Sequence, residues 1–493
     1  MIDENKMVRM ILGFKVKHLR QQLGLSYQEL ATKTGLSTSY INDIERGKKY
    51  PKPAKLTQLG KGLEVDYNFL VSTKKKKKLQ PVIDLLHSDF FKNFPLEEFG
   101  ISPDKLLEVF TSTPEKVSAF VSTIFKIARH YQVTEAEFYK VALRSYQDMH
   151  NNYFADLEAA VVKFRKQFGV RKALLEWKNQ LEKILTEEYN ISIDYDKLNQ
   201  QKSLRGIRSY FNKNSRTLLI NNELSSKQQY FLLARELAFQ FLNYKNRPYE
   251  TRILQIDNFE QLLNNFRASY FAVALLMPEK TLVKDIERVS RSSDWNGEVL
   301  LKWLDKYQVT QEMLMQRLTN ILPQHFGIED LFFLRLTSND RLDHFRMTKE
   351  LHLSQLHNPY NNQLEEHYCR RWVSVTALKE LRTKMAMQPD QNRLADGQIS
   401  QYWQTDNEYF CMSLAKPTSS DSKESVSVTV GLLITPNLRS TFNFLNDPKL
   451  RKRTVHTTCE RCSVSNCESR VKPPVVIEEE RSGERVLEEL GKL

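Results

Sequence analysis

The sequence lacks any long apolar run. No stretch approaches the roughly 20 consecutive apolar residues that a membrane-spanning helix needs. The opening residues, MIDENKMVRM, also lack the apolar core of a signal peptide. We therefore expect a cytoplasmic protein in a reducing compartment, with no membrane partner. No internal repeat is evident either.

Cysteine is scarce, and its distribution is uneven. The chain has 5 cysteines in 493 residues, and three of them form the motif Cys459-x2-Cys462-x4-Cys467. In a reducing compartment, clustered thiols are typical of a metal or iron–sulfur site rather than of a disulfide. A fourth ligand must come from elsewhere. Cys369 follows a polar, turn-like stretch and is the better candidate, because Cys411 lies in an alternating, strand-like run and is expected to be buried. Four thiolates suit either a zinc ion or a cubane cluster, and free structural thiols are the remaining interpretation.

Acidic residues are few at the start of the chain. Residues 1–78 hold 17 Lys+Arg against 7 Asp+Glu, so they supply most of the net charge of +13. This asymmetry indicates a polyanion partner for that segment. The five consecutive lysines at 74–78 repel one another and mark a domain boundary.

Two short helices joined by a glycine are expected within the basic segment. Ser26 and Glu29 have the capping-box spacing, which predicts a helix over 27–34 that ends at Gly35. Ser37 can cap a second helix over 38–46. The pair has the geometry of a helix-turn-helix.

The stretch SYQELATKTGLSTSYINDIERGKKYPKP resembles the lambda-repressor/Xre family. The resemblance implies that the second helix enters the major groove of DNA, where its first turns reach base edges. The implied base-reading side chains are Thr38, Ser39, Asn42 and Asp43. The implied phosphate contacts are Lys48, Lys49 and, in place of the glutamine usual in that family, Tyr27.

The length of the chain and its pattern of apolar residues predict an α+β multidomain protein. An all-α helix-turn-helix domain is followed by a mostly helical middle and a mixed α/β C-terminal domain. A small hairpin is expected at 203–222, and strands are expected at 332–336, 409–414 and 425–434. The predicted divisions are 1–72 (DNA-binding domain), 73–80 (basic linker), 81–200 (helical region), 201–325 (peptidase-like domain), 326–472 (α/β domain with the cysteines) and 473–493 (acidic, loosely held tail).

The middle domain resembles the ImmA/IrrE-type metallopeptidases, whose zinc helix reads HExxH. Here the corresponding stretch is LLARELAFQFL: Glu236 is retained, but Arg235 and Phe239 take the positions of the ligands and cannot bind zinc. The resemblance therefore implies the peptidase fold without catalysis, and we expect no enzyme. A site that has lost its zinc can take another ligand. The basic candidates for an anionic ligand are Arg205, Arg208, Arg235 and Arg267, and Tyr270 is among the aromatic residues that could line the pocket; Arg235, Arg267 and Tyr270 are the predicted ligand-binding residues.

Several motifs occur in the order typical of short-chain acyl-CoA transcriptional regulators of the PrpR/RamB type. They are HNNYFADLEAA (150–160), YFAVALLMP (270–278), FFLRL (332–336), C-x-x-W (369–372) and the terminal cysteine motif. The resemblance implies a regulator of fatty-acid or central carbon metabolism genes with a short-chain acyl-CoA as its effector. It also implies a [4Fe–4S] cluster held by Cys369, Cys459, Cys462 and Cys467, with zinc as the alternative. Because one small helix-turn-helix reads few base pairs, we expect a homodimer or a higher homo-oligomer on double-stranded DNA. The alternatives are a metallopeptidase of a stress or phage response and a redox or metal sensor without an organic ligand.

Overall fold

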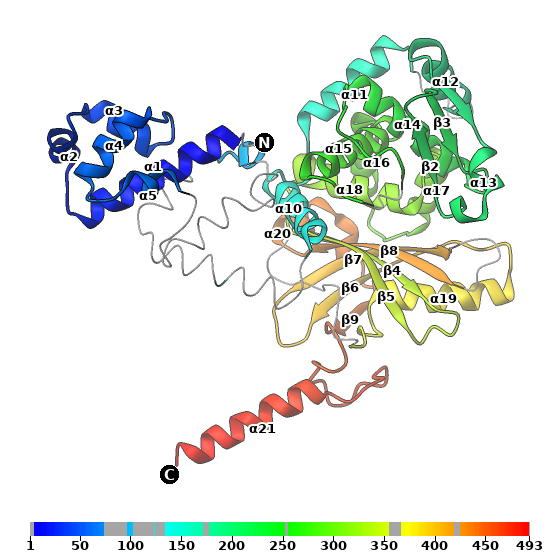
Figure 1. Cartoon of the computed structure of the whole chain (residues 1–493). Coiled ribbons are helices and arrows are strands. Elements are labelled where there is room, and N and C mark those ends of the chain that lie inside the picture. Colours follow the sequence, from blue (N-terminus) through cyan, green and yellow to red (C-terminus); the bar gives the residue numbers. More distant parts are fainter. Residues whose placement is uncertain are drawn as a thin grey trace. The chain divides into compact units, whose positions relative to one another are not determined.

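The protein is α+β and multidomain, as predicted, and its computed structural model divides into two compact units (Figure 1). The first unit comprises residues 1–146 with 254–263, and the second comprises 147–253 with 264–493. The predicted linker at 73–80 lies outside the described residues. The structure describes residues 4–72, 96–101, 123, 134–170, 177–251, 255–353, 366–418 and 424–492.

The helices of residues 4–72, which we call the head, follow the predicted helix-turn-helix closely. They are α1 (Glu4–Gln22), α2 (Tyr27–Thr34), α3 (Thr38–Glu45), α4 (Pro53–Gly62) and α5 (Tyr67–Val71). The Ser26–Glu29 capping box begins α2, and the hydroxyl of Ser37 accepts a hydrogen bond from the Tyr40 amide at the start of α3. Gly35 ends α2 with φ of 68°, a backbone conformation that glycine adopts without strain.

The head has an apolar core whose central side chains are fully buried. Leu30, Ile41 and Ile44 have no exposed surface, so α3 is held from beneath by its apolar stripe. Helix α1 crosses α3 at Gly13, where a Cβ would stand 2.4 Å from the carbonyl oxygen of Ile44. This close approach fixes α3 against the rest of the head. The described remainder of the first unit includes a short 3-10 helix (Leu96–Phe99) and α10 (Glu135–Met149).

The second unit begins with helices around a small sheet. Its three strands, β1 (Ser192–Asp194), β2 (Ser209–Asn212) and β3 (Thr217–Ile220), have the order β1-β3-β2. The antiparallel pair β2–β3 confirms the predicted hairpin. The helices of this part are α11 (Ala155–Gln167), α12 (Trp177–Lys183), α13 (Lys197–Gln200), α14 (Ser226–Phe241), α15 (Phe259–Leu276, of which Asn264–Leu276 belongs to this unit), α16 (Glu279–Ser290), α17 (Glu298–Lys306) and α18 (Gln311–Phe326).

A second sheet of six strands completes this unit, in the order β5-β4-β8-β7-β6-β9. The predicted strands at 332–336, 409–414 and 425–434 are confirmed as β4, β7 and β8, while β5, β6 and β9 were not predicted individually. The bounds are β4 (Leu331–Ser338), β5 (Phe345–His352), β6 (Leu394–Tyr402), β7 (Glu408–Pro417), β8 (Ser425–Leu433) and β9 (Lys452–Val455), with helices α19 (Val373–Met387) and α20 (Pro436–Thr441).

The two faces of this sheet are covered by different helices (Figure 1). Helix α19 packs on one face, with Leu378 and Leu381 in the same core as Leu334. Because side chains alternate along a strand, the neighbouring residues point the other way, toward α16, α17 and α18. There Phe410 and Met412 help to line a wholly apolar cavity of about 30 Å³.

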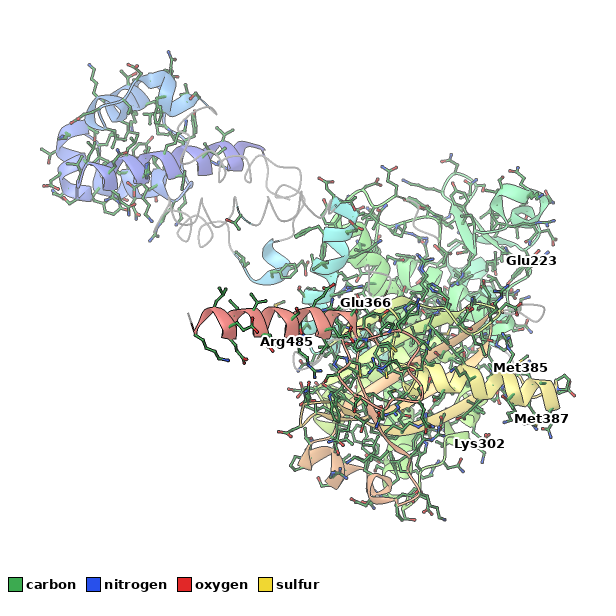
Figure 2. The ribbon with its side chains drawn as sticks, turned by 90° about the horizontal axis from the view of Figure 1, so that it is seen from below. Glu223, Lys302, Glu366, Met385, Met387 and Arg485 are labelled. Atoms are coloured by element: carbon green, nitrogen blue, oxygen red, sulfur yellow. The ribbon has the colours of Figure 1, made fainter. Side chains whose placement is uncertain are left out.

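The predicted acidic tail forms a helix, α21 (Val475–Leu490), which the sequence analysis did not predict. None of its residues is buried, so it gains little from packing in this chain. Figure 2 shows its side chains, Arg485 among them, standing clear of the sheet. Within the described ranges, none of the helices combines the length and the apolarity that crossing a bilayer requires.

Candidate functional site

Helix α3 presents the predicted base-reading residues on the side away from the core. Ser39 is exposed, and Thr38, Asn42 and Asp43 are half-buried. Ile41 and Ile44, between them in sequence, point inward. The arrangement is the one that a helix needs to offer short polar side chains to the edges of bases.

A buried ion pair joins α1 to the end of α3. The guanidinium of Arg20 donates to both carboxylate oxygens of Glu45, over 2.7 and 2.9 Å. The phenol of Tyr27 donates to the same carboxylate over 2.8 Å, and Arg20 stacks on the Tyr27 ring at 4.1 Å. While this bond persists, the Tyr27 hydroxyl cannot donate to a phosphate, so the structure gives Tyr27 a role inside the head.

The loop after α3 carries the predicted phosphate contacts. Lys48 is exposed, whereas Lys49 forms an ion pair with Asp43 at 3.0 Å, so two of the predicted contact residues bind each other. Lys55, in the first turn of α4, was not predicted as a contact residue. Its ammonium lies 4.1 Å from the centre of the Tyr40 ring, and the ammonium of Lys49 lies 5.5 Å from the same centre. The charge of Lys55 was visible in the sequence, but its position beside α3 was not.

The glutamate of the degenerate zinc motif is bound by an arginine. Glu236, on α14, is buried and forms a two-pronged ion pair with Arg247 over 2.8 and 2.5 Å. Gln240 also donates to Glu236, over 2.7 Å. The Arg247 guanidinium lies 3.7 Å from the centre of the Phe239 ring. Glu236 is therefore a structural anion, fully engaged by the protein itself.

Arg235 is buried next to this pair but has no carboxylate of its own. Its guanidinium donates to the amide oxygen of Asn265 at 2.5 Å and lies 5.0 Å from the Phe239 ring centre. Among the described residues it makes no ion pair. Burial, together with the like charge of Arg247, lowers the pKa of Arg235 to about 10. A bound anion would relieve this penalty.

The other two predicted ligand residues lie in separate networks. Arg267 donates to the hydroxyl of Tyr244 over 2.6 Å and forms an ion pair with Asp156. Tyr270 donates to Glu158 over 2.7 Å, and Glu158 is held by the fully buried Arg317. Among the described residues, Arg235, Arg267 and Tyr270 share no hydrogen-bond partner, and their role in binding one ligand stays a prediction.

The cysteine motif meets Cys369 through a short backbone pairing. Tyr368 and Thr458 form an isolated antiparallel bridge. The amide of Cys369 donates to the carbonyl of Thr457, and the amide of Cys459 donates to that of His367. Cys369 and Cys459 each follow one residue of the bridge. Because side chains alternate along a strand, both cysteine side chains point to the side opposite those of Tyr368 and Thr458.

All five cysteines are free thiols, four of them buried and Cys467 half-buried. Cys369 lies close enough to Cys459 and Cys462 to interact electrostatically with both, and burial raises the pKa of its thiol to about 11. Cys411 is buried within β7, as expected, and burial raises the pKa of its thiol to about 12. In the part of the chain that the structure describes, no group of three or more His, Cys, Asp or Glu side chains is arranged to hold a metal ion. The metal site therefore stays a prediction.

An arginine braces the loop of the cysteine motif. The Arg470 guanidinium donates to the carbonyls of Cys459 and Cys462, each at 3.0 Å, and to that of Val464 at 2.5 Å. Trp403 donates its indole N–H to Ser463 over 2.8 Å. The loop is thus fixed by side chains from both sides.

Comparisons with known proteins match two separate segments of the chain to known families. A helix-turn-helix family model matches residues 16–70, and the model of the IrrE N-terminal-like domain, of the M78 peptidase family, matches residues 186–319. The HTH-type transcriptional regulator RamB of Mycobacterium tuberculosis is 23% identical over 336 residues, which are 64% of this chain and 66% of that protein. PrpR, an HTH-type transcriptional regulator of the same organism, is 23% identical over 347 residues, 66% of each chain. The chain thus spans just under two thirds of the length of these relatives.

Two further similarities concern smaller or looser matches. An uncharacterized HTH-type transcriptional regulator of Sinorhizobium fredii, y4dJ, is 31% identical over 65 residues, and the match covers 13% of this chain and 84% of that protein. A solved transcriptional regulator from Mycobacterium tuberculosis has a TM-score of 0.47 at 18% identity, over 68% of this chain and 94% of that one. With its exposed α3, its basic flank and these relatives, the chain belongs to the helix-turn-helix transcriptional regulators, and it carries an IrrE-like domain after its head.

Proposed function

We propose that this DNA-binding regulator senses a short-chain acyl-CoA through its second unit and does not act as a peptidase. It would act on double-stranded DNA as a homodimer and control genes of fatty-acid or central carbon metabolism. The single observation that carries the ligand proposal is Arg235, a buried guanidinium without an ion pair among the described residues. The motif order shared with short-chain acyl-CoA regulators supports the choice of ligand.

The chemistry around Glu236 argues against proteolysis. A metallopeptidase needs a metal-bound water and a free carboxylate that takes its proton. Here Glu236 is bound by Arg247 and Gln240, and neither Arg235 nor Phe239 offers a lone pair to zinc. Glu236 is thus retained, but the two zinc ligands of the motif are replaced.

Arg235 provides what an anionic effector needs. A guanidinium in a dry site binds a phosphate or carboxylate with two parallel hydrogen bonds, and both gain strength from low local polarity. Among the described residues its hydrogen-bond partner is Asn265, which is neutral and orients the guanidinium without neutralising it. The effector would therefore be recognised first by its charge, with the acyl chain adding apolar contact.

Adding a short acyl-CoA to the full chain is expected to raise its melting temperature, because a ligand that binds only the folded state stabilises it by about 2.7 kcal/mol at a hundredfold excess over Kd. Arg235→Met should abolish the shift. Arg291→Met, at the exposed end of α16, is the matched control and should keep it. Thermal shift with acetyl-, propionyl- and butyryl-CoA, each compared with free CoA, measures this. If none of the acyl-CoAs changed the melting temperature at millimolar concentration, the proposal would be wrong.

We further propose that Cys369, Cys459, Cys462 and Cys467 hold a [4Fe–4S] cluster, with zinc as the alternative. The donor set fits either group, because thiolates are the preferred ligands of both. Two observations support the proposal: the Tyr368–Thr458 bridge pairs the backbone beside Cys369 with the backbone beside Cys459, and Arg470 binds the carbonyls of Cys459 and Cys462. The bound group would crosslink segments that are about 90 residues apart in sequence.

Metal analysis of protein purified without oxygen is expected to find iron and sulfide, or zinc. Cys459→Ser should lower both the metal content and the melting temperature, because binding of the group is coupled to folding. Cys411→Ser, which changes a buried thiol outside the predicted set, should leave the metal content unchanged. Folded wild-type protein without metal would contradict the site.

A further inference from the structure

A second group of basic side chains gathers around the six-stranded sheet and the start of α18. We call it the basic cluster: Arg208, Lys227, Arg335, Lys349 and Lys416. The only carboxylates that interact with its members among the described residues are Glu312, at the start of α18, and Asp305. Positive charge therefore exceeds negative charge strongly in a small volume.

The register of the sheet brings three of these cations to one face. Arg335 lies opposite Lys349 on β5 and opposite Val428 on β8. On the far side of β8, Lys416 of β7 lies opposite Val426, two residues from Val428. Residues opposite one another, and residues two apart, share a face. Arg335, Lys349 and Lys416 thus point together toward α18, whose Glu312 binds Arg335 at 3.3 Å and also pairs with Lys349.

Two members of the cluster have no partner. Within the described part of the chain, the side chains of Arg208 and Lys416 make no hydrogen bond and no ion pair. Lys227, by contrast, donates to the Leu304 carbonyl and to Asp305, which also binds Arg393. Arg208 is exposed and Lys416 is half-buried. A ligand from solvent can therefore reach the cluster at Arg208.

The crowded positive charge of the cluster lowers the pKa of one of its lysines and the pKa of the carboxylate beside it. Burial, together with the neighbouring Lys227, Arg335 and Arg208, lowers the pKa of Lys416. Burial alone would raise the pKa of Glu312, yet Lys349, Arg335 and Arg208 hold it below its ordinary value. The positive charges of the cluster repel one another. An anion bound among them would replace this repulsion by attraction.

We propose that the basic cluster binds the diphosphate group of a small molecule, with Arg208 and Lys416 as direct contacts and Arg335 and Lys349 behind them. A diphosphate matches the excess charge and offers enough oxygen acceptors for several cations at once. The site goes beyond the proposed function, because its proposed contacts lie on β4, β5, β7 and the segment before β2, whereas Arg235 lies on α14. Its ligand could be the diphosphate of the proposed acyl-CoA or that of a free nucleotide.

Calorimetric titration of the full chain with inorganic pyrophosphate tests the site. Wild type should bind, and Lys416→Met and Arg208→Met should each weaken binding about tenfold or more, a loss of about 1.4 kcal/mol. Because Arg208 is exposed, its variant is expected to fold even if Lys416→Met does not. Lys379→Met, which removes an exposed lysine of α19 on the opposite face of the sheet, is the matched control and should bind like wild type.

The remaining outcomes separate this site from the head and from Arg235. Equal affinity in wild type and both cluster variants would place pyrophosphate elsewhere, for example on the basic head, and would overturn the proposal. Displacement of pyrophosphate by CoA or by ADP supports it and identifies the source of the diphosphate, whereas displacement by neither overturns it. Arg235→Met should leave pyrophosphate binding intact even where the acyl-CoA shift is lost, so the two proposals fail independently.

Discussion

Replacing Arg20 by methionine is expected to unfold the head and to abolish DNA binding, although Arg20 lies behind α3 and away from its exposed face. The change leaves Glu45 as a buried carboxylate with only the Tyr27 hydroxyl as a donor. Removing one partner of a buried ion pair costs about 3–5 kcal/mol, which is close to the whole stability of a small domain. Hydrogen exchange of head amides in the full chain should then rise about a hundredfold or more.

The control for this prediction is an exposed ion pair of the same domain. Lys33 and Glu64 are 3.4 Å apart with side chains 46% and 64% exposed. Pairs in water contribute about 0–1 kcal/mol, so Lys33→Met should barely change exchange in the head. If Arg20→Met behaved like Lys33→Met, the ion pair would not be what secures α3.

Arg247→Met is expected to destabilise the second unit by about 3–5 kcal/mol, since it leaves Glu236 buried without its cation. The methionine also loses the contact between the guanidinium and the Phe239 ring. Hydrogen exchange of α14 in the full chain measures the effect. Peptides containing Glu236 should lose protection first.

A second substitution shows whether the buried charge is the cause. Combining Arg247→Met with Glu236→Gln removes both charges, so it should restore much of the protection of α14. The matched single variant is Arg393→Met, which breaks the exposed, two-pronged pair with Asp305 and should have a small effect. Equal effects of Arg247→Met and Arg393→Met would refute the structural role given to Glu236.

Local signals explain why the head was predictable from sequence. The Ser26–Glu29 capping box, the stop at Gly35 and the cap at Ser37 each act within four residues, and all three occur as expected. Strands rich in β-branched residues, such as β8, were also predicted from the sequence. Strand β5 was missed because its sequence, FRMTKELH, is mostly polar, which suits a strand at the edge of a sheet.

The candidate sites were less predictable, because their contacts are long-range. The loss of zinc ligands at Arg235 and Phe239 was evident within one helix. The ion pair between Arg247 and Glu236 was not evident, since Arg247 lies outside the motif and reaches Glu236 only through the fold. The basic cluster likewise joins β4, β5, β7 and α14, and only the strand register reveals which of their charges share a face.

The affinity of the full chain for duplex DNA, measured as a function of salt, tests the account most directly. With a duplex selected from a random pool, log K should fall linearly with log salt concentration, and Lys48→Ala should reduce the slope by about 0.9 because one phosphate contact is lost. Asn42→Ala should keep the slope but lose about 1–3 kcal/mol of discrimination at one base pair. Lys379→Met on α19 should match wild type in both respects. If no duplex were retained, or if Asn42→Ala and Lys48→Ala bound as wild type does, the assignment of the head as a sequence-reading DNA-binding domain would be contradicted.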